Sequence, residues 1–224
     1  MRRWMRRASD YDWIAEQLVR RGVTDPEVLR VMRAVPREAF VPLEIRHLAY
    51  QDGALPIGRG QTISQPYIVA RMTEMLAMRA WRKAHGGEQP KVLDVGTGSG
   101  YQAAILAQMG ARVVSIEMEA ELAERARRTL AELGHDVDVR VGDGSAGTPG
   151  DAPFAGIIVA AASPQIPVPL VEQLLPDGRL VIPIGTRFEQ VITLVRRTED
   201  GFTQEPFEPA VFVPLLGEHG FGGR

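Results

Sequence analysis

Short apolar segments alternate with helical stretches from residue 91 to residue 185, and this alternation limits the folds open to the chain more than any other feature. The strand-like segments are KVLDVG, ARVVSIEME, DVDVRVGD, FAGIIVAAA and LVIPIG. The helical stretches between them are YQAAILAQMG, AELAERARRTLAELG and PVPLVEQL. Because FAGIIVAAA is wholly apolar, we expect this strand to be buried on both faces. Strands that alternate with helices predict an α/β fold with a parallel sheet.

Two helices are expected near the N-terminus. Ser9 can cap a helix through DYDWIAEQLVRRG, with Asp12 in its first turn and Gly22 at its end. The second helix is predicted over TDPEVLRVMRAVP, where Thr24 or Asp25 is the capping residue. Apolar residues recur at helical spacing in both stretches, so each helix should bury one face.

The segments on either side of the alternating half are less regular. Residues 41–66 hold several prolines and glycines without a sustained period, which predicts an ordered irregular segment. Residues 67–81 return to helical spacing. Pro183 lies inside the fifth strand, so the hydrogen bonding of this strand should end there or meet a bulge. Beyond it we expect further strands with a hairpin at EDG, and the closing GEHGFGGR is predicted to be a frayed tail.

Composition excludes several classes of function. The chain has 224 residues, 45% hydrophobic and 24% charged, as in an ordinary globular protein. Its net charge is −2, which gives no electrostatic reason to bind nucleic acid or a membrane. There is no cysteine and the four histidines are far apart, so no metal site is expected. The arginine-rich start MRRWMRRASD is followed by no apolar run of signal-peptide length, which predicts a solvated tail on a cytoplasmic protein.

A glycine-rich turn is the first motif that carries chemistry. VLDVGTGSGYQAA places Gly96, Gly98 and Gly100 where a strand turns into a helix. Glycine permits the tight turn and a close approach of a ligand to the backbone, and helix N-termini favour anionic groups. Glu117 ends the next strand, 117 − 96 = 21 residues after Gly96, close to the spacing of about 20 at which an acid binds a ribose. A purely structural turn remains the alternative for the glycines alone.

The acids around this turn favour S-adenosylmethionine over a dinucleotide. Tyr101 stands where the third glycine of a dinucleotide motif would be. Asp94, just before the turn, is a poor neighbour for a pyrophosphate but a good one for an amino group. Asp143 follows the third strand and could accept a hydrogen bond from an adenine amino group, although a plain turn residue before Gly144 explains it equally well.

Longer motifs carry a more specific resemblance. LDVGTGSGY, Glu117 and GDG resemble the cofactor motifs of Rossmann-like S-adenosylmethionine-dependent methyltransferases. AVPREAFVP, AYQDGALPIGRGQTISQPYIVARMTEML and LLPDGRLVIPIG closely resemble the protein-L-isoaspartate O-methyltransferase family, from about residue 13 to 216. The resemblance implies a doubly wound, mostly parallel sheet with helices on both faces. It divides the chain into N-terminal helices with a substrate-facing loop, 1–88, and a cofactor-binding core, 89–224, within one compact domain.

Membership of this family implies an activity and a set of residues. The enzymes methylate the α-carboxylate of L-isoaspartyl residues, and also of D-aspartyl residues, in damaged proteins. The active-site serine of the family corresponds to Ser64, and Gln61, Thr62 and Ile63 correspond to positions that contact the cofactor. The other expected cofactor-binding residues are Ser64, Asp94, Gly96, Thr97, Gly98, Gly100, Glu117, Asp143 and Gly144. We expect a monomer without a metal ion.

The chemistry of methyl transfer to a carboxylate explains a hydroxyl-rich loop. An α-carboxylate, whose pKa is ordinarily about 3.5, is already ionised at neutral pH, so no general base is required. Neutral donors such as Ser64 and Thr62 can align it without stabilising the charge that is lost in the transition state. Alternatively, both hydroxyls serve only to cap the helix after Pro66.

Other functions remain possible on the residues alone. A methyltransferase for a small molecule or nucleic acid should carry an added substrate domain or a basic, aromatic patch, and residues 186–224 offer neither. A silent cofactor-binding module should have a degraded methyl-donor site, whereas Asp94, Glu117 and Asp143 are all present.

Overall fold

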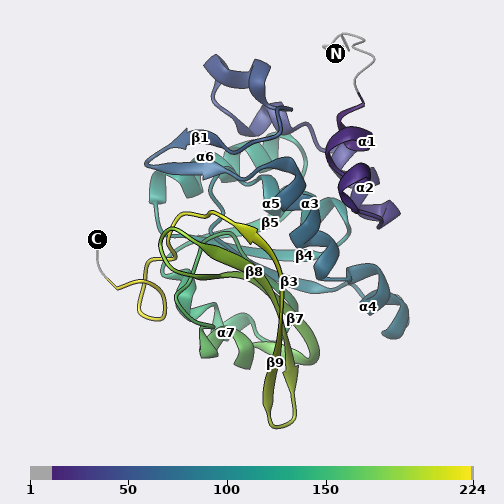
Figure 1. Cartoon of the computed structure of the whole chain (residues 1–224), viewed down its shortest axis with the longest axis vertical. Coiled ribbons are helices and arrows are strands. Elements are labelled where there is room, and N and C mark those ends of the chain that lie inside the picture. Colours follow the sequence, from purple (N-terminus) through teal and green to yellow (C-terminus); the bar gives the residue numbers. More distant parts are fainter. Residues whose placement is uncertain (1–11, 223–224) are drawn as a thin grey trace.

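The computed structural model describes residues 12–222, so Ser9 and the arginine-rich start lie outside the described part. Its main element is a seven-stranded sheet in the order β5-β4-β3-β6-β7-β8-β9 (Figure 1). The strands are β3 Lys91–Val95, β4 Arg112–Glu117, β5 Val137–Val141, β6 Phe154–Val159, β7 Leu174–Gly185, β8 Gln190–Thr198 and β9 Gly201–Ala210. The first five in spatial order are parallel, and β8 and β9 are antiparallel. The predicted mostly parallel α/β sheet is confirmed.

Helices cover both faces of the sheet, and each face has its own apolar core. One core joins alternate strand residues to the N-terminal helices and to α5 Tyr101–Gln108 and α6 Ala120–Glu132. The other lies beneath α7 Val168–Glu172 and the segment after β9. Within β3, Val92 belongs to the first core and Leu93 to the second, as expected for a strand whose side chains alternate between faces. β6 is buried along its whole length, as predicted.

The strand order reverses beside β3, and this reversal positions a ligand site. β3 lies between β4 on one side and β6 on the other, so the connections that leave the two strands run in opposite directions. In open parallel sheets, ligands bind at the carboxyl ends of the strands next to such a reversal. The glycine turn follows β3 directly and therefore lies at this point.

Both N-terminal helices form, with one correction to the predicted caps. Helix α1 Trp13–Gln17 starts after Asp12, which accepts the N–H of Ile14 at 3.1 Å. Asp12 is therefore the cap rather than a residue of the first turn. A 3-10 turn, η1 Val19–Arg21, completes the stretch before Gly22, whose left-handed backbone ends it. Helix α2 Pro26–Ala34 is capped by Asp25, one of the two residues predicted.

The prediction that residues 41–66 are irregular is partly wrong. After the 3-10 helices η2 Arg37–Phe40 and η3 Leu43–Leu48, strands β1 Leu55–Gly58 and β2 Gln61–Ile63 form a small antiparallel hairpin. The single helix predicted over 67–81 is also two helices, α3 Pro66–Met75 and α4 Met78–Ala84. The chain breaks between them because Ala77 adopts a left-handed backbone, with φ of 50°.

The C-terminal part of the chain completes the sheet with its last strands. Pro183 follows the final β6–β7 pair, Ile158 with Val181, but it pairs with Ile192 of β8, and β7 continues to Gly185 without a bulge. The prediction that the hydrogen bonding of this strand ends at Pro183 or meets a bulge there is therefore wrong. The hairpin at EDG is confirmed between β8 and β9. β9 is one of the two edge strands, opposite β5, and contains Pro206 and Pro209. No described helix is long and apolar enough to cross a membrane.

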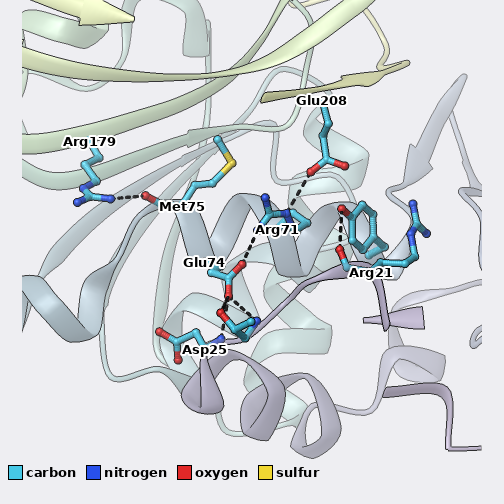
Figure 2. Close-up of polar contacts among 9 residues, drawn as sticks. Arg21, Asp25, Arg71, Glu74, Met75, Arg179 and Glu208 are labelled. Carbon is cyan, nitrogen blue, oxygen red and sulfur yellow. Dashed lines mark hydrogen bonds and ion pairs between the residues drawn. The ribbon is translucent and has the colours of Figure 1, made fainter. Parts of the chain in front are cut away.

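A polar network fixes α3 between the N-terminal helices and β9 (Figure 2). Glu74 Oε1 accepts the backbone N–H groups of Thr24 at 2.7 Å and Asp25 at 2.8 Å. Its other oxygen, Oε2, accepts a hydrogen bond from Arg71 Nη1 at 2.5 Å, and Arg71 Nε donates to Glu208 Oε1 of β9 at 3.1 Å. The network therefore holds the helix that begins immediately after residues 61–65.

Candidate active site

A cavity of about 330 Å³ opens at the carboxyl ends of β3 and β4. Its walls come from the hairpin and α3, from the glycine turn, from the end of β4 and from the segment after β9. The structure brings together, from widely separated parts of the chain, the predicted residues Gln61, Thr62, Ile63, Ser64, Gly96, Thr97, Gly98, Glu117 and Gly144. Asp94, Gly100 and Asp143 do not line the cavity.

The glycine turn has the backbone that the sequence predicts. Gly96, Gly98 and Gly100 all have positive φ values, of 89°, 52° and 90°. A Cβ on Gly100 would lie 3.3 Å from side-chain atoms of Ala126 and Leu130 in α6. Gly100 therefore permits close helix packing, whereas Gly96 and Gly98 face the cavity.

Glu117 lies where an acid could bind a ribose. It ends β4 and is almost fully buried beside the turn. Its Oε2 accepts the Gly98 N–H at 2.7 Å, and its Oε1 accepts the Glu119 N–H at 3.0 Å. These two bonds fix the carboxylate in place. Because an ionised carboxylate offers about four lone-pair positions, it can still accept hydroxyl hydrogens from a ligand.

Asp94 is buried beneath the turn rather than exposed to the cavity. Its Oδ2 accepts the Ser115 hydroxyl at 2.7 Å, and the Ser115 and Thr97 hydroxyls lie 2.5 Å apart. Its Oδ1 has no hydrogen-bond partner within residues 12–222. Burial raises the pKa of Asp94 to about 7, the Ser115 hydrogen bond opposes this rise, and the charge of Glu117 adds to it.

Asp143 already has partners from the C-terminal segment. Its Oδ1 accepts the Ser145 N–H at 2.8 Å and its Oδ2 accepts the Glu218 N–H at 2.9 Å. Partial burial raises the pKa of Asp143, but these N–H donors outweigh it and hold the pKa below its usual value. The prediction of a frayed tail is therefore wrong for residues 217–221, which also include a backbone bond from Phe221 to Leu215.

The Ser64 hydroxyl lies beside the cavity without a hydrogen-bond partner among the described residues. The residue is half-buried. Helix α3 starts after Gln65, and no side chain caps it. The alternative that Ser64 or Thr62 serves as a helix cap is therefore wrong. Nor does any histidine or acid among residues 12–222 bond to Ser64, so nothing there activates it as a nucleophile.

Comparison with known proteins decides the family. The family model described as protein-L-isoaspartate(D-aspartate) O-methyltransferase matches residues 10–220. The chain belongs to this family. It is 54% identical over 204 residues to a protein-L-isoaspartate O-methyltransferase of Methylorubrum extorquens, covering 91% of this chain and 86% of the relative. It is 52% identical over 215 residues to one of Aeropyrum pernix, covering 93% and 80%.

Solved structures of the isoaspartate methyltransferases agree with the fold. One named protein-L-isoaspartate O-methyltransferase superposes with a TM-score of 0.76 at 26% identity, covering 94% of this chain and 65% of the other. A second, from Plasmodium falciparum and in complex with S-adenosyl-L-homocysteine, has a TM-score of 0.75 at 24% identity, covering 90% and 96%. The family, the enzyme class and S-adenosylmethionine as methyl donor are thus confirmed.

Several residues of the methyltransferase cavity were not predicted. Phe212, Val213, Pro214, Leu215 and Leu216 line it after the chain returns from β9. Their sequence has no motif of its own, and tertiary contacts such as the bridge between Ala162 and Pro214 bring them to the cavity. Arg59 also lines the cavity and was overlooked because a single arginine between two glycines forms no recognisable motif. Within residues 12–222, no group of His, Cys, Asp or Glu is arranged to hold a metal ion.

Proposed function

We propose that Ser64 holds the α-carboxylate of an isoaspartyl residue in line with the methyl group of S-adenosylmethionine. The observation that carries this proposal is the Ser64 hydroxyl, which lines the cavity, has no hydrogen-bond partner within residues 12–222 and caps no helix. A free hydroxyl at a cavity wall is available to a ligand. Thr62, exposed within β2, is a second neutral donor at the same cavity.

The acidic residues in and beside the cavity support binding of the methyl donor there. Glu117, fixed by two N–H groups, would bind the ribose hydroxyls. The Ser99 N–H has no acceptor in the described part of the chain and would bind the carboxylate of the methionyl part, because it is close to the start of α5. Asp94 would act from beneath the turn on the amino group, and Asp143 would orient the adenine end through Gly144.

The reaction is a direct displacement at carbon. A carboxylate oxygen of the substrate attacks the methyl carbon, the carbon–sulfur bond breaks, and its electron pair stays on sulfur. The products are a methyl ester and S-adenosylhomocysteine. No proton has to be removed, so the lack of a base bonded to Ser64 within the described residues is compatible with the chemistry. The enzyme contributes alignment of the reacting atoms.

Transfer of a labelled methyl group to an isoaspartyl peptide, beside the same peptide with ordinary aspartate, tests this function. We expect label only in the isoaspartyl peptide and its release as methanol in mild alkali. Base-stable label would show methylation at nitrogen and would favour the alternative substrate classes. A D-aspartyl peptide in the same assay measures whether that isomer is accepted.

We further propose a division of the chain within one compact unit. Residues 1–88 supply the helices and the substrate-facing loop, and residues 89–224 supply the methyl-donor core. The enzyme acts on damaged proteins in the cytoplasm as a monomer and does not bind nucleic acid. The net charge of −2 supports the lack of nucleic-acid binding.

A further inference from the structure

The turn of the β1–β2 hairpin has an unusual backbone at Arg59. Gly58, Arg59 and Gly60 all have positive φ values, of 91°, 55° and 70°. Glycine adopts this conformation freely, whereas an L residue with a side chain adopts it at a cost. Within residues 12–222, Ala77 is the only other residue besides glycines with positive φ. Nothing lies within 4 Å of a Cβ built on Gly58 or Gly60, so crowding does not explain the turn.

The side chain of Arg59 supplies a reason for its place. It lines the methyl-donor cavity, and its guanidinium forms an ion pair with Glu121 in the first turn of α6. The hydrogen bond and charge of the partner raise the pKa of Arg59 and lower that of Glu121. One turn further along α6, Arg125 Nη2 donates to the carbonyl oxygen of Ile57 at 2.5 Å. Helix α6 therefore holds the hairpin at two points.

The same helix is tied to the proposed ribose site. Helix α6 starts at Ala120, 120 − 117 = 3 residues after Glu117, and the intervening Met118 and Glu119 line the cavity. The ion pair thus joins the tip of the hairpin to the wall that carries Glu117. Strained backbone that persists beside a ligand cavity is a recognised sign of function.

We propose that Arg59 is a binding residue that retains the methyl donor, and that its ion pair with Glu121 closes the hairpin over the adenosyl end of the cavity. This inference rests on the proposed assignment of the ribose to Glu117. Ligand exchange then requires the pair to open. Both side chains are more than half exposed, 56% for Arg59 and 66% for Glu121, so the pair is weak enough to open in each catalytic cycle.

The test is the rate at which radiolabelled S-adenosylhomocysteine leaves the full-length protein when excess unlabelled ligand is added. Glu121→Gln removes the pair without changing the hairpin sequence. Arg59→Asn removes the guanidinium but keeps a residue that tolerates a left-handed backbone. We expect either variant to release the ligand about 2- to 5-fold faster, the range measured for exposed ion pairs. Salt should speed release from the wild type and have less effect on Glu121→Gln.

Two further variants complete the design. The exchanged pair Arg59→Glu with Glu121→Arg should release the ligand more slowly than either single variant, at close to the wild-type rate. Arg33→Asn is the matched control, because it breaks a similarly exposed ion pair, with Asp12, away from the cavity, and should leave release unchanged. Glu117→Ala should weaken binding if the ribose assignment is correct. A different outcome would be weakened binding in Glu117→Ala together with ligand release at the wild-type rate in Glu121→Gln and Arg59→Asn. In that case the proposed role of the Arg59–Glu121 ion pair is wrong and the ribose site stands. Unchanged binding in Glu117→Ala overturns the site itself.

Discussion

The Ser115 hydroxyl donates to Asp94 Oδ2 at 2.7 Å, while Asp94 Oδ1 has no partner in the described part of the chain. One hydrogen bond is too little to offset the burial of a charged carboxylate, and for this reason the pKa of Asp94 rises to about 7. The acid that precedes the glycine turn is therefore half-protonated near neutral pH.

This pKa predicts a pH-dependent stability that Asp94→Asn removes. The folded state binds the proton more tightly than the unfolded chain, whose pKa is near 3.8, so the contribution of Asp94 to stability falls as pH rises from about 4 to about 7. Between pH 5 and pH 8, the free energy of unfolding of Asp94→Asn should rise relative to the wild type by about 3 kcal/mol. Urea titrations at the two pH values measure this difference. A constant difference would contradict the raised pKa.

Glu117→Ala should lower the affinity for S-adenosylhomocysteine. The variant loses hydrogen bonds between a charged acceptor and the ribose, at about 1.5–3 kcal/mol, which corresponds to about 10- to 150-fold in affinity. The Gly98 N–H also loses its partner, so the turn should loosen. Calorimetric titration measures the affinity, and a Kd equal to that of the wild type would refute the ribose assignment.

Ser64→Ala should lower turnover far more than cofactor affinity or stability. The loss of one hydrogen bond to the substrate carboxylate should raise the barrier by about 1.5–3 kcal/mol, or about 10- to 150-fold in kcat. Because Ser64 caps no helix, the melting temperature should stay near that of the wild type. Steady-state kinetics on an isoaspartyl peptide, with a melting curve, check both expectations.

Ser64→Thr keeps the hydroxyl and separates positioning from nucleophilic catalysis. If the hydroxyl only aligns the carboxylate, Ser64→Thr should retain part of the turnover rate, and Ser64→Ala should keep a low but measurable turnover rate. Total loss of activity in a folded Ser64→Ala protein would instead point to a covalent role. Normal turnover in that variant would remove Ser64 from the active site.

Gly217→Ala should disturb the C-terminal segment that bonds to Asp143. Gly217 has a φ of 136°, and a Cβ there would clash with Asp143 Oδ1. Accommodation of this methyl group should cost about 1–3 kcal/mol and displace the carboxylate. Thermal stability and S-adenosylhomocysteine affinity should both decrease. Gly222→Ala is the control, since nothing lies within 4 Å of its Cβ, and equal behaviour of the two variants would contradict the expectation.

The fold was predictable because its signals are local. The apolar segments of residues 91–185 each mark a strand, and Gly96, Gly98 and Glu117 carry their spacing in the sequence itself. The β1–β2 hairpin was missed because its turn depends on a left-handed Arg59, a conformation that no residue type signals. The break after α3 was missed for the same reason at Ala77.

The parts of the site that were not predicted come from residues that are distant in the sequence and reach the cavity only in the folded chain. Phe212 and Leu216 reach the cavity only after the β8–β9 hairpin, and no spacing connects them to the glycine turn. Likewise, the partner of Asp143 is a backbone N–H at residue 218, which every non-proline residue possesses. Backbone contacts of this kind cannot be predicted from the residue types in the sequence.

The edge strand β9 has a consequence for how the protein behaves at high concentration. A free strand edge is a template onto which the strands of other chains can add, and uncontrolled addition leads to aggregation. In β9, Pro206 and Pro209 have no N–H to offer. An incoming strand would find a broken row of donors. The β9 edge therefore hinders the addition of strands from other chains to this side of the sheet.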